Sequence, residues 1–435
     1  MITTCYRGYS SLILLWALLG GAPARAWSLH YLVTDRALAL PGWENRLADT
    51  VKVESLDSFV TDRQADLAPL FAQYYAWLEQ TGAKRFKPVI FDAGHPGSAA
   101  FLRAARLNPT SVFSLVNRVL PGQISRKPSV SFAQIDPFEK MDPNVIFKFE
   151  DVTGQSVTAR SVVVTFADEP DWWIDRDLFE NPEYGYGQIP YGKPTGESAA
   201  APFHTQFAHE NLLVRLTAAE ITEGMASQRL ELFTRLSRRA FRSGHPYWGY
   251  RFAAWAIHYA QDLTQPYHSK AVPLANLWFY VKFAVSGDKL RIKRETSQLV
   301  YDRHRLYEDL VMLWLQDSYF QSEGLPTRIA HALKGDEVPW SDLDGSELTT
   351  PLFTHISAQA AKSAHDVDLA VTQGFGPTLT QDPQYDLEQD PRYDSRRAQT
   401  SMSTAHFESL ASETVINLRW TGQATRTLLS ACLRR

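Results

Sequence analysis

Residues 258–268 read HYAQDLTQPYH and place two histidines and an aspartate around a Gln-Pro turn. In a helix, His258 and Asp262 are four residues apart and therefore lie on one face. Pro266 ends such a helix, so the chain can turn and bring His268 near the first pair. The residues around His258 are largely apolar, and a carboxylate buried among them is costly unless a positive charge compensates it. A bound cation would supply that charge.

A second stretch repeats the spacing. Residues 304–308 read HRLYE, with His304 and Glu308 again four residues apart. One such pair alone is more often a solvated helix face or a hydrogen-bonded pair. Two pairs together with His268 favour a metal site, because imidazole nitrogen and carboxylate oxygen are typical ligands of zinc.

Helical periodicity dominates the chain and predicts a mainly α fold. The predicted helices cover roughly residues 30–40, 64–82, 206–241, 248–264, 273–284, 292–320, 353–372 and 402–432. Residues 145–166 are the exception, because their β-branched alternation around Thr153 and Gly154 predicts a small β-hairpin. The stretch 374–396 predicts a long polar loop.

The first 26 residues have the layout of a secretory signal peptide: a basic residue, a short apolar run and the small-x-small motif Ala24-Arg25-Ala26. We therefore expect an exported protein, periplasmic or secreted, whose mature chain begins at Trp27. No later uncharged apolar stretch reaches the roughly 18 residues of a membrane-spanning helix, so we expect no transmembrane anchor.

The motif HYAQDLTQPYH resembles the H-Y-x-x-D-x-x-Q-P-x-H core of the zinc-dependent phospholipases C and the single-strand-specific zinc nucleases. Shorter matches accompany it. HYLVTDRAL, beginning at His30, is similar to the first-helix histidine segment of that superfamily. FADEPDW, followed by APFH, is similar to its aspartate and histidine elements, and Trp27 resembles its N-terminal tryptophan. The resemblance implies one helical domain over residues 27–435, with an insertion at about 41–165.

The resemblance also implies three zinc ions held by nine residues. The ligands of the first zinc would be Asp168, His204, His258 and Asp262. Those of the second would be His268, His304 and Glu308. Those of the third would be the amine and carbonyl of Trp27 together with His30, with Asp262 shared between the first and third ions.

Two positions have a rival close by in the sequence. Asp171 competes with Asp168, and His209 competes with His204. We favour Asp168 and His204 by their place in the matched segments.

The function implied by the resemblance is phosphodiester hydrolysis by metal-bound hydroxide, with Asp168 orienting or deprotonating the attacking water. We favour a phospholipase C that acts on phospholipid and contacts the membrane surface transiently. The formal net charge of −4 disfavours nucleic acid mildly, and the aromatic-rich segment before His204 suits a lipid headgroup. Two alternatives stay open: a single-strand-specific zinc nuclease, and a non-catalytic exported binding protein stabilised by zinc.

Overall fold

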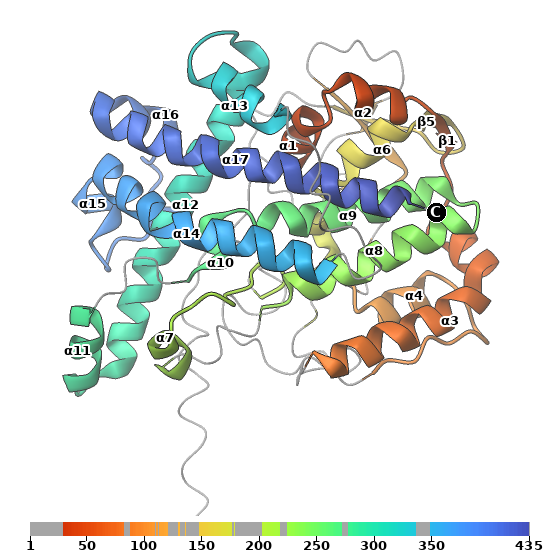
Figure 1. The fold of residues 1–435 in the computed structure, drawn as a ribbon, viewed down its shortest axis with the longest axis horizontal. Helices are drawn as coiled ribbons and strands as arrows, with labels where there is room; N and C mark the ends of the chain where they lie inside the picture. Colours follow the sequence, from red (N-terminus) through yellow and green to blue (C-terminus); the bar gives the residue numbers. More distant parts are fainter. Residues whose placement is uncertain are drawn as a thin grey trace, which may run out of the picture.

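The fold is seen in a computed structural model that describes a defined part of the chain (Figure 1). The described residues are 29–81, 88–108, 110–111, 113–120, 129–130, 135, 148–175, 178, 202–217, 224–271, 277–335 and 349–434. Most of them are helical, so the expectation of a mainly α protein is confirmed. The expected signal peptide and Trp27 lie outside the described residues. Across the described ranges, no helix combines the length and apolar character that crossing a bilayer requires.

The helical hairpin of α8 (Ala226–Arg242) and α9 (Pro246–Asp262) forms the centre of the fold (Figure 1). Gly244 lies between the two helices with a φ of 83°, a left-handed conformation that glycine adopts without strain. Pro246 occupies the first turn of α9, where a missing N–H is tolerated. From Tyr247 onward every residue of α9 is buried, so its polar side chains must find their partners inside the protein.

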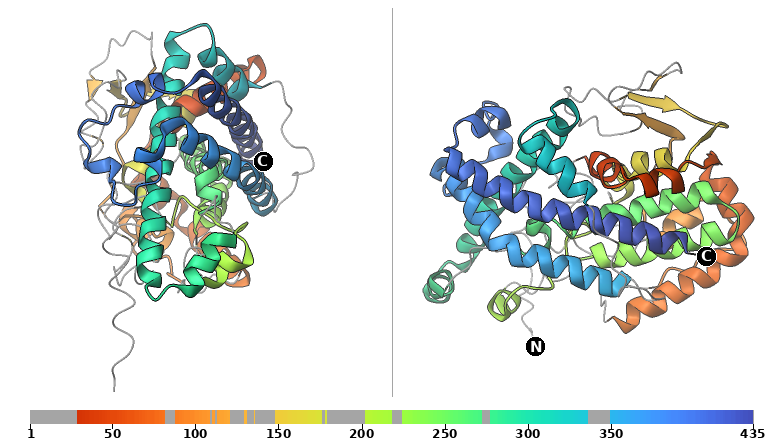
Figure 2. Two further views of the ribbon diagram at one scale, coloured as in Figure 1. Left: turned by 90° about the vertical axis from the view of Figure 1, so that its left-hand side faces the viewer. Right: turned by 45° about the horizontal axis from the view of Figure 1, so that its top comes forward.

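Long helices pack around this hairpin (Figure 2). α17 (Thr404–Leu433) lies against α9 and also contacts α14 (Thr349–Phe375) and α13 (Leu325–Lys334). α12 (Lys289–Phe320) packs against α13 and α14, and α1 (His30–Ala37) packs against α17. Segments from both ends of the chain therefore meet at α9.

Two apolar clusters make up the core. The first surrounds α8 and α9 and contains Trp248, Trp255 and Leu263. The second lies among α1, α12, α13 and α17 and contains Tyr31 and Tyr307. Leu263 directly follows α9, and the two tyrosines are next to His30 and Glu308 in the sequence. The predicted ligands thus lie where the two clusters adjoin.

Two small antiparallel sheets belong to the region predicted to be an insertion. β1 (Thr50–Lys52) pairs with β5 (Ser156–Thr158). In the other sheet β4 (Lys148–Asp151) is central, with β2 (Val116–Val119) on one side and β3 (Ser129–Val130) on the other. The second view of Figure 2 shows these strands far from the end of the molecule that carries α11 (Leu277–Val285).

The predicted hairpin over 145–166 is wrong. β4 and β5 flank the expected turn at Gly154, which has a φ of 72°, but in the described residues they pair with different strands and not with each other. The rest of the stretch is a helix, α6 (Ala159–Phe166), whose N-terminus is capped by Thr158 accepting from the Ser161 N–H. α6 buries its valines against α9. Burial of the α6 valines in the tertiary structure therefore outweighs the β-propensity of that segment.

Other predicted elements differ in their limits. The predicted helix over 206–241 is two helices, α7 (Leu212–Thr217) and α8. The predicted loop over 374–396 contains α15 (Pro377–Thr380) and a 3-10 turn, η4 (Leu387–Gln389), and α16 (Ser395–Thr400) begins at its end. The remaining helices are α2 (Pro41–Arg46), α3 (Leu56–Gln80), α4 (Ser98–Ala105), the π-helical turn η1 (Pro170–Ile174) and α10 (Pro266–Ser269).

Candidate metal site

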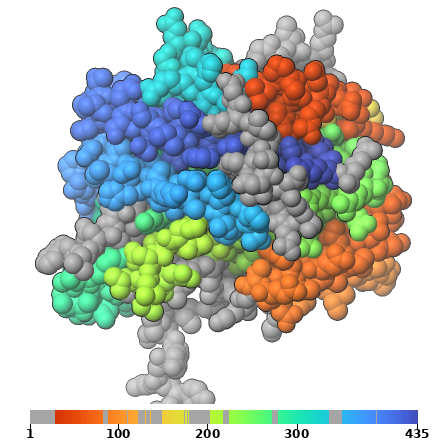
Figure 3. Space-filling model, viewed as in Figure 1, coloured from red at the N-terminus to blue at the C-terminus, as the bar shows by residue number. Residues whose placement is uncertain are grey.

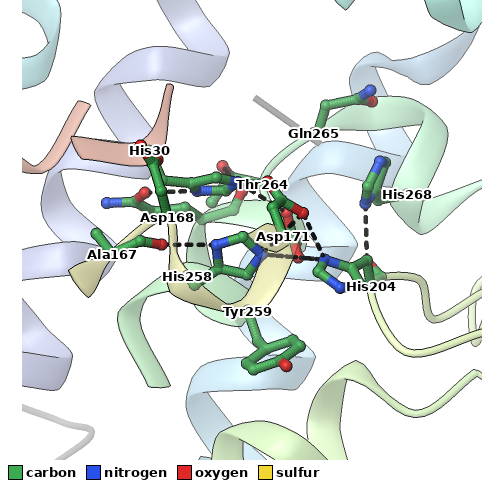
Figure 4. A network of polar contacts seen from close by, with 12 residues as sticks. His30, Ala167, Asp168, Asp171, His204, His258, Tyr259, Thr264, Gln265 and His268 are labelled. Atoms are coloured by element: carbon green, nitrogen blue, oxygen red, sulfur yellow. Dashed lines mark hydrogen bonds and ion pairs between the residues drawn. The ribbon is translucent and has the colours of Figure 1, made fainter. Parts of the chain in front are cut away.

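Three groups of potential metal ligands come together in the interior, and Figure 4 shows His30, Asp171, His204, His258 and His268 among them. Within each group one ligand atom from every residue lies within 4.8 Å of the others. The groups are His30 with Asp171 and His258; His204 with His258 and Asp262; and His268 with His304 and Glu308. Seven of the nine residues expected from the sequence are therefore among these groups, and His258 belongs to two of them.

Asp262 lies between the histidines of the first two groups. Its Oδ2 is 2.9 Å from His204 Nδ1 and 3.4 Å from His258 Nε2. Its Oδ1 is 3.4 Å from His30 Nε2. The i, i+4 spacing along α9 sets the contact with His258, as the sequence predicts. A carboxylate with one oxygen toward each group is suited to bridging two cations.

Three of the histidines are oriented by a hydrogen bond from the ring nitrogen that faces away from the groups. The contacts are His258 Nδ1 to the Ala167 carbonyl at 2.7 Å, His268 Nδ1 to the His204 carbonyl at 2.7 Å, and His30 Nδ1 to Gln261 Oε1 at 2.8 Å. Because these oxygens only accept, Nδ1 carries the proton in each case. The neutral imidazole then presents the lone pair of Nε2 to the group, as metal-binding histidines do.

Two of these lone pairs, those of His258 and His268, face other ring nitrogens. His258 Nε2 is 3.0 Å from His204 Nδ1, and His268 Nε2 is 3.2 Å from His304 Nε2. Two neutral nitrogens at such distances repel unless a proton or a cation lies between them. Among the described residues the buried Glu308 Oε2 has no hydrogen-bond partner, and the nearest approach between His30 Nε2 and Asp262 Oδ1 is 3.4 Å. The donor set therefore fits a bound metal.

The first two groups are rich in negative charge. Burial lowers the pKa of His204, but the charge of Asp262 and the hydrogen bonds with Asp175 and Asp262 outweigh it and raise the pKa to about 10. Burial also opposes protonation of His30, and Asp262 again prevails and raises its pKa to about 8. Burial raises the pKa of Asp171 to about 6. Without a metal, protonated histidines must balance these carboxylates.

The third group is simpler. Burial raises the pKa of Glu308, but His304 and His268 more than offset this and lower it to about 2. Burial lowers the pKa of His304. Gln265, from the Gln-Pro turn of the motif, donates to Glu308 Oε1 at 3.2 Å and holds that carboxylate in place.

Asp168 stands outside all three groups, so the structure does not bring it together with the other expected ligands. Its Oδ2 accepts a hydrogen bond from Arg118 Nη2 at 2.7 Å. Its Oδ1 accepts from the backbone N–H of Tyr31 at 3.0 Å. Tyr31 directly follows His30, so Asp168 holds the start of α1 in place, and its charge also acts on His30 and Asp171.

Asp171 takes the place that the sequence-based interpretation gave to Asp168. The π-helical turn η1 directs its carboxylate inward, 3.6 Å from both His204 Nδ1 and His258 Nε2. Its side chain is 19% exposed, whereas those of His258 and Asp262 are fully buried. Asp171 therefore lies at the solvent side of the first two groups.

The rival of His204 does not join the site. His209 Nε2 contacts the hydroxyl of Ser357 at 2.8 Å, outside all three groups. Trp27, expected to bind the third ion, lies outside the described residues.

Sequence analysis missed Asp175. Its Oδ2 is 3.3 Å from His204 Nε2 and accepts from Tyr259, while Arg229 pairs with Oδ1. This fully buried carboxylate orients His204 from the side opposite Asp262. In the sequence, Asp175 stands out only as a second aspartate four residues after Asp171. The irregular π-helical turn between the two prevents a prediction of where Asp175 points.

Comparisons with known proteins identify no relative of this chain. No protein-family model matches it, and neither does any curated protein or any solved structure. The likeness of the HYAQDLTQPYH motif therefore stays a resemblance, and function has to be inferred from the side chains of the site.

Proposed function

We propose that the protein is an exported zinc-dependent phosphodiesterase, and specifically a phospholipase C. The observation that carries the proposal is the convergence of eight buried or nearly buried ligands in three adjoining groups, with ring nitrogens facing one another at 3.0 and 3.2 Å. Without a cation, protonated histidines have to balance the buried carboxylates, and bound divalent cations would replace those protons.

The donor set favours zinc over magnesium or calcium. Together the groups supply five imidazoles and three carboxylates, whereas magnesium and calcium are bound mainly by oxygen. His258 is shared by two groups and has one free ring nitrogen, so an ion in any group would have at most three of these ligands and keep a coordination position open, as in catalytic zinc sites; structural sites usually have four. This count supports an enzyme over a zinc-stabilised binding protein.

Clustered zinc ions supply Lewis acidity: they lower the pKa of water and stabilise charge on a phosphoryl group. The protein's own contribution is to hold the ligands in place among buried side chains, with Asp171 the most exposed of them. Asp171, the most exposed of the eight ligands, is the carboxylate placed to accept a hydrogen bond from an attacking water and to take its proton. We therefore assign to Asp171 the role first expected for Asp168.

Phospholipid is favoured over nucleic acid as the substrate. The chain has a formal net charge of −4, which gives no general attraction to a polyanion. Trp172, from the aromatic segment expected to bind a headgroup, is buried against Phe149 and does not supply a binding surface. The preference therefore rests on charge, and export rests on the first 26 residues.

Purified protein should release phosphocholine from phosphatidylcholine. A zinc chelator should abolish the release, and added zinc should restore it. The Asp171→Asn variant should hydrolyse much more slowly even with zinc in excess, because the amide cannot take the proton of the attacking water. Nucleotide release from single-stranded DNA or RNA, with no phosphocholine, would reassign the substrate to nucleic acid. Hydrolysis that is indifferent to the chelator would overturn the metal mechanism.

A further inference from the structure

Two neighbouring short helices each expose apolar side chains. α7 and α11 lie side by side at the lower left of Figures 1 and 3. On α7, Leu212 and Leu216 are 69% and 71% exposed, and Val285 at the end of α11 is 79% exposed. These are among the most exposed large apolar residues described, and exposed apolar residues gathered in one place mark an interaction surface.

The two helices are joined by a direct contact. Asn211, at the start of α7, donates a hydrogen bond from Nδ2 to the Tyr280 hydroxyl of α11 at 2.7 Å. Both helices also follow a ligand closely in the chain, α7 after His204 and α11 after His268. α12 begins beside α11 at Lys289 and runs from there to His304. The surface is therefore connected through three segments to the candidate site.

The charge of this corner is opposite to that of the whole chain. Residues 277–295 contain five basic and two acidic side chains, although the full sequence has a net charge of −4. Lys282, Lys289 and Arg294 are exposed. The α11 sequence LWFYVKFAV carries one charge, Lys282, among apolar and aromatic residues. Basic residues beside exposed leucine and aromatic-rich helices are typical of segments that lie in a membrane interface.

We infer that α7, α11 and the first two turns of α12 form a docking surface for an anionic lipid membrane. Lys282, Lys289 and Arg294 would meet lipid phosphates, while Leu212 and Val285 enter the headgroup region. A second copy of the chain fits less well, because a twofold interface would place this basic corner against itself. The inference rests on the proposed function only in preferring lipid as the partner, because docking requires neither zinc nor hydrolysis.

The test is vesicle binding by the full chain with a chelator present, so that hydrolysis plays no part. Vesicles of phosphatidylcholine alone are compared with vesicles that also contain phosphatidylglycerol. We expect binding to the anionic vesicles that weakens with added salt. The triple variant Leu212→Ser, Leu216→Ser, Val285→Ser should bind about tenfold more weakly, since it removes three apolar contacts.

A matched control removes exposed apolar residues from other helices and loops. Ile90, Leu369 and Ile416 are 88%, 39% and 46% exposed, and their triple serine variant should bind vesicles as well as the unaltered protein. Circular dichroism checks the fold of both variants.

Equal binding by both variants, or no binding by the unaltered protein, would overturn the inference. A dimer that the first variant loses would assign the surface to a second copy. If the protein does not bind vesicles but still hydrolyses a soluble phosphodiester, the docking inference is wrong and the proposed function is retained.

Discussion

The two halves of the candidate site are built differently. We name the half with His30, Asp171, His204, His258 and Asp262 the aspartate region, and the half with His268, His304 and Glu308 the glutamate region. The aspartate region draws its ligands from α1, η1, α9 and the segment before α7. The glutamate region needs only α10 and α12. The first therefore depends on several tertiary contacts, and the second depends mainly on one turn of helix.

The largest effect is expected from Asp262→Asn. This change removes the carboxylate that faces His30, His204 and His258. Even supporting residues of metal sites contribute roughly ten- to a hundredfold to affinity or activity, so hydrolysis should fall by more than about a hundredfold. Elemental analysis should show zinc missing from the aspartate region while the glutamate region keeps its ion. Full zinc content in this variant would contradict a bridging role.

Glu308→Gln tests the glutamate region in the same way. Glu308 is 2.7 Å from His304 Nε2 and 3.4 Å from His268 Nε2. The amide is a poorer ligand than the carboxylate, so one zinc should be lost and hydrolysis should fall by at least about tenfold. Zinc in the aspartate region should be retained. Loss of all zinc in either variant would show that the two regions do not bind independently.

A smaller effect is expected from Asp168→Asn, which acts through α1. The amide oxygen can still accept from the Tyr31 N–H, but the ion pair with Arg118 is lost. We expect hydrolysis to fall by about tenfold because His30 is held less firmly. Zinc content should stay near that of the unaltered protein, as measured by elemental analysis.

Asp35→Asn is the matched control for Asp168→Asn. Asp35 also holds α1 and also pairs with an arginine, Arg160, at 2.6 Å, but it lies nearer the other end of the helix. Both variants weaken the fold to a similar degree, so thermal unfolding should be comparable. Only Asp168→Asn should reduce hydrolysis strongly. If Asp168→Asn loses as much zinc as Asp262→Asn, Asp168 is itself a zinc ligand.

The smallest effect is expected from His209→Gln. His209 contacts Ser357 and joins neither region, so hydrolysis should stay within about twofold and zinc content should not change. His204→Gln, made alongside it, should remove the ligand whose Nδ1 lies 2.9 Å from Asp262. A strong loss in His209→Gln would reverse the choice between the two histidines.

The glutamate region was largely predictable, because its geometry is local. His304 and Glu308 lie one turn apart on a single helix, and the same spacing places His258 near Asp262. These two relations follow from helix geometry alone. His268, on α10 after the proline, reaches His304 and Glu308 through a tertiary contact.

The aspartate region was only partly predictable, because tertiary contacts decide which carboxylate turns inward. Asp168 and Asp171 are three residues apart. The sequence alone does not show that Arg118 forms an ion pair with Asp168. The π-helical turn that directs Asp171 inward has no clear sequence signature. The same limit explains the false hairpin: the valines of α6 match a strand pattern, and only packing against α9 makes them helical.

The most direct test of the account is X-ray diffraction from crystals grown with zinc, measured on both sides of the zinc absorption edge. The account predicts anomalous peaks among the facing nitrogens and carboxylates of both regions, with Asp262 between two peaks and Glu308 beside another. Crystals that bind zinc elsewhere, or that show none within the aspartate and glutamate regions, would contradict it.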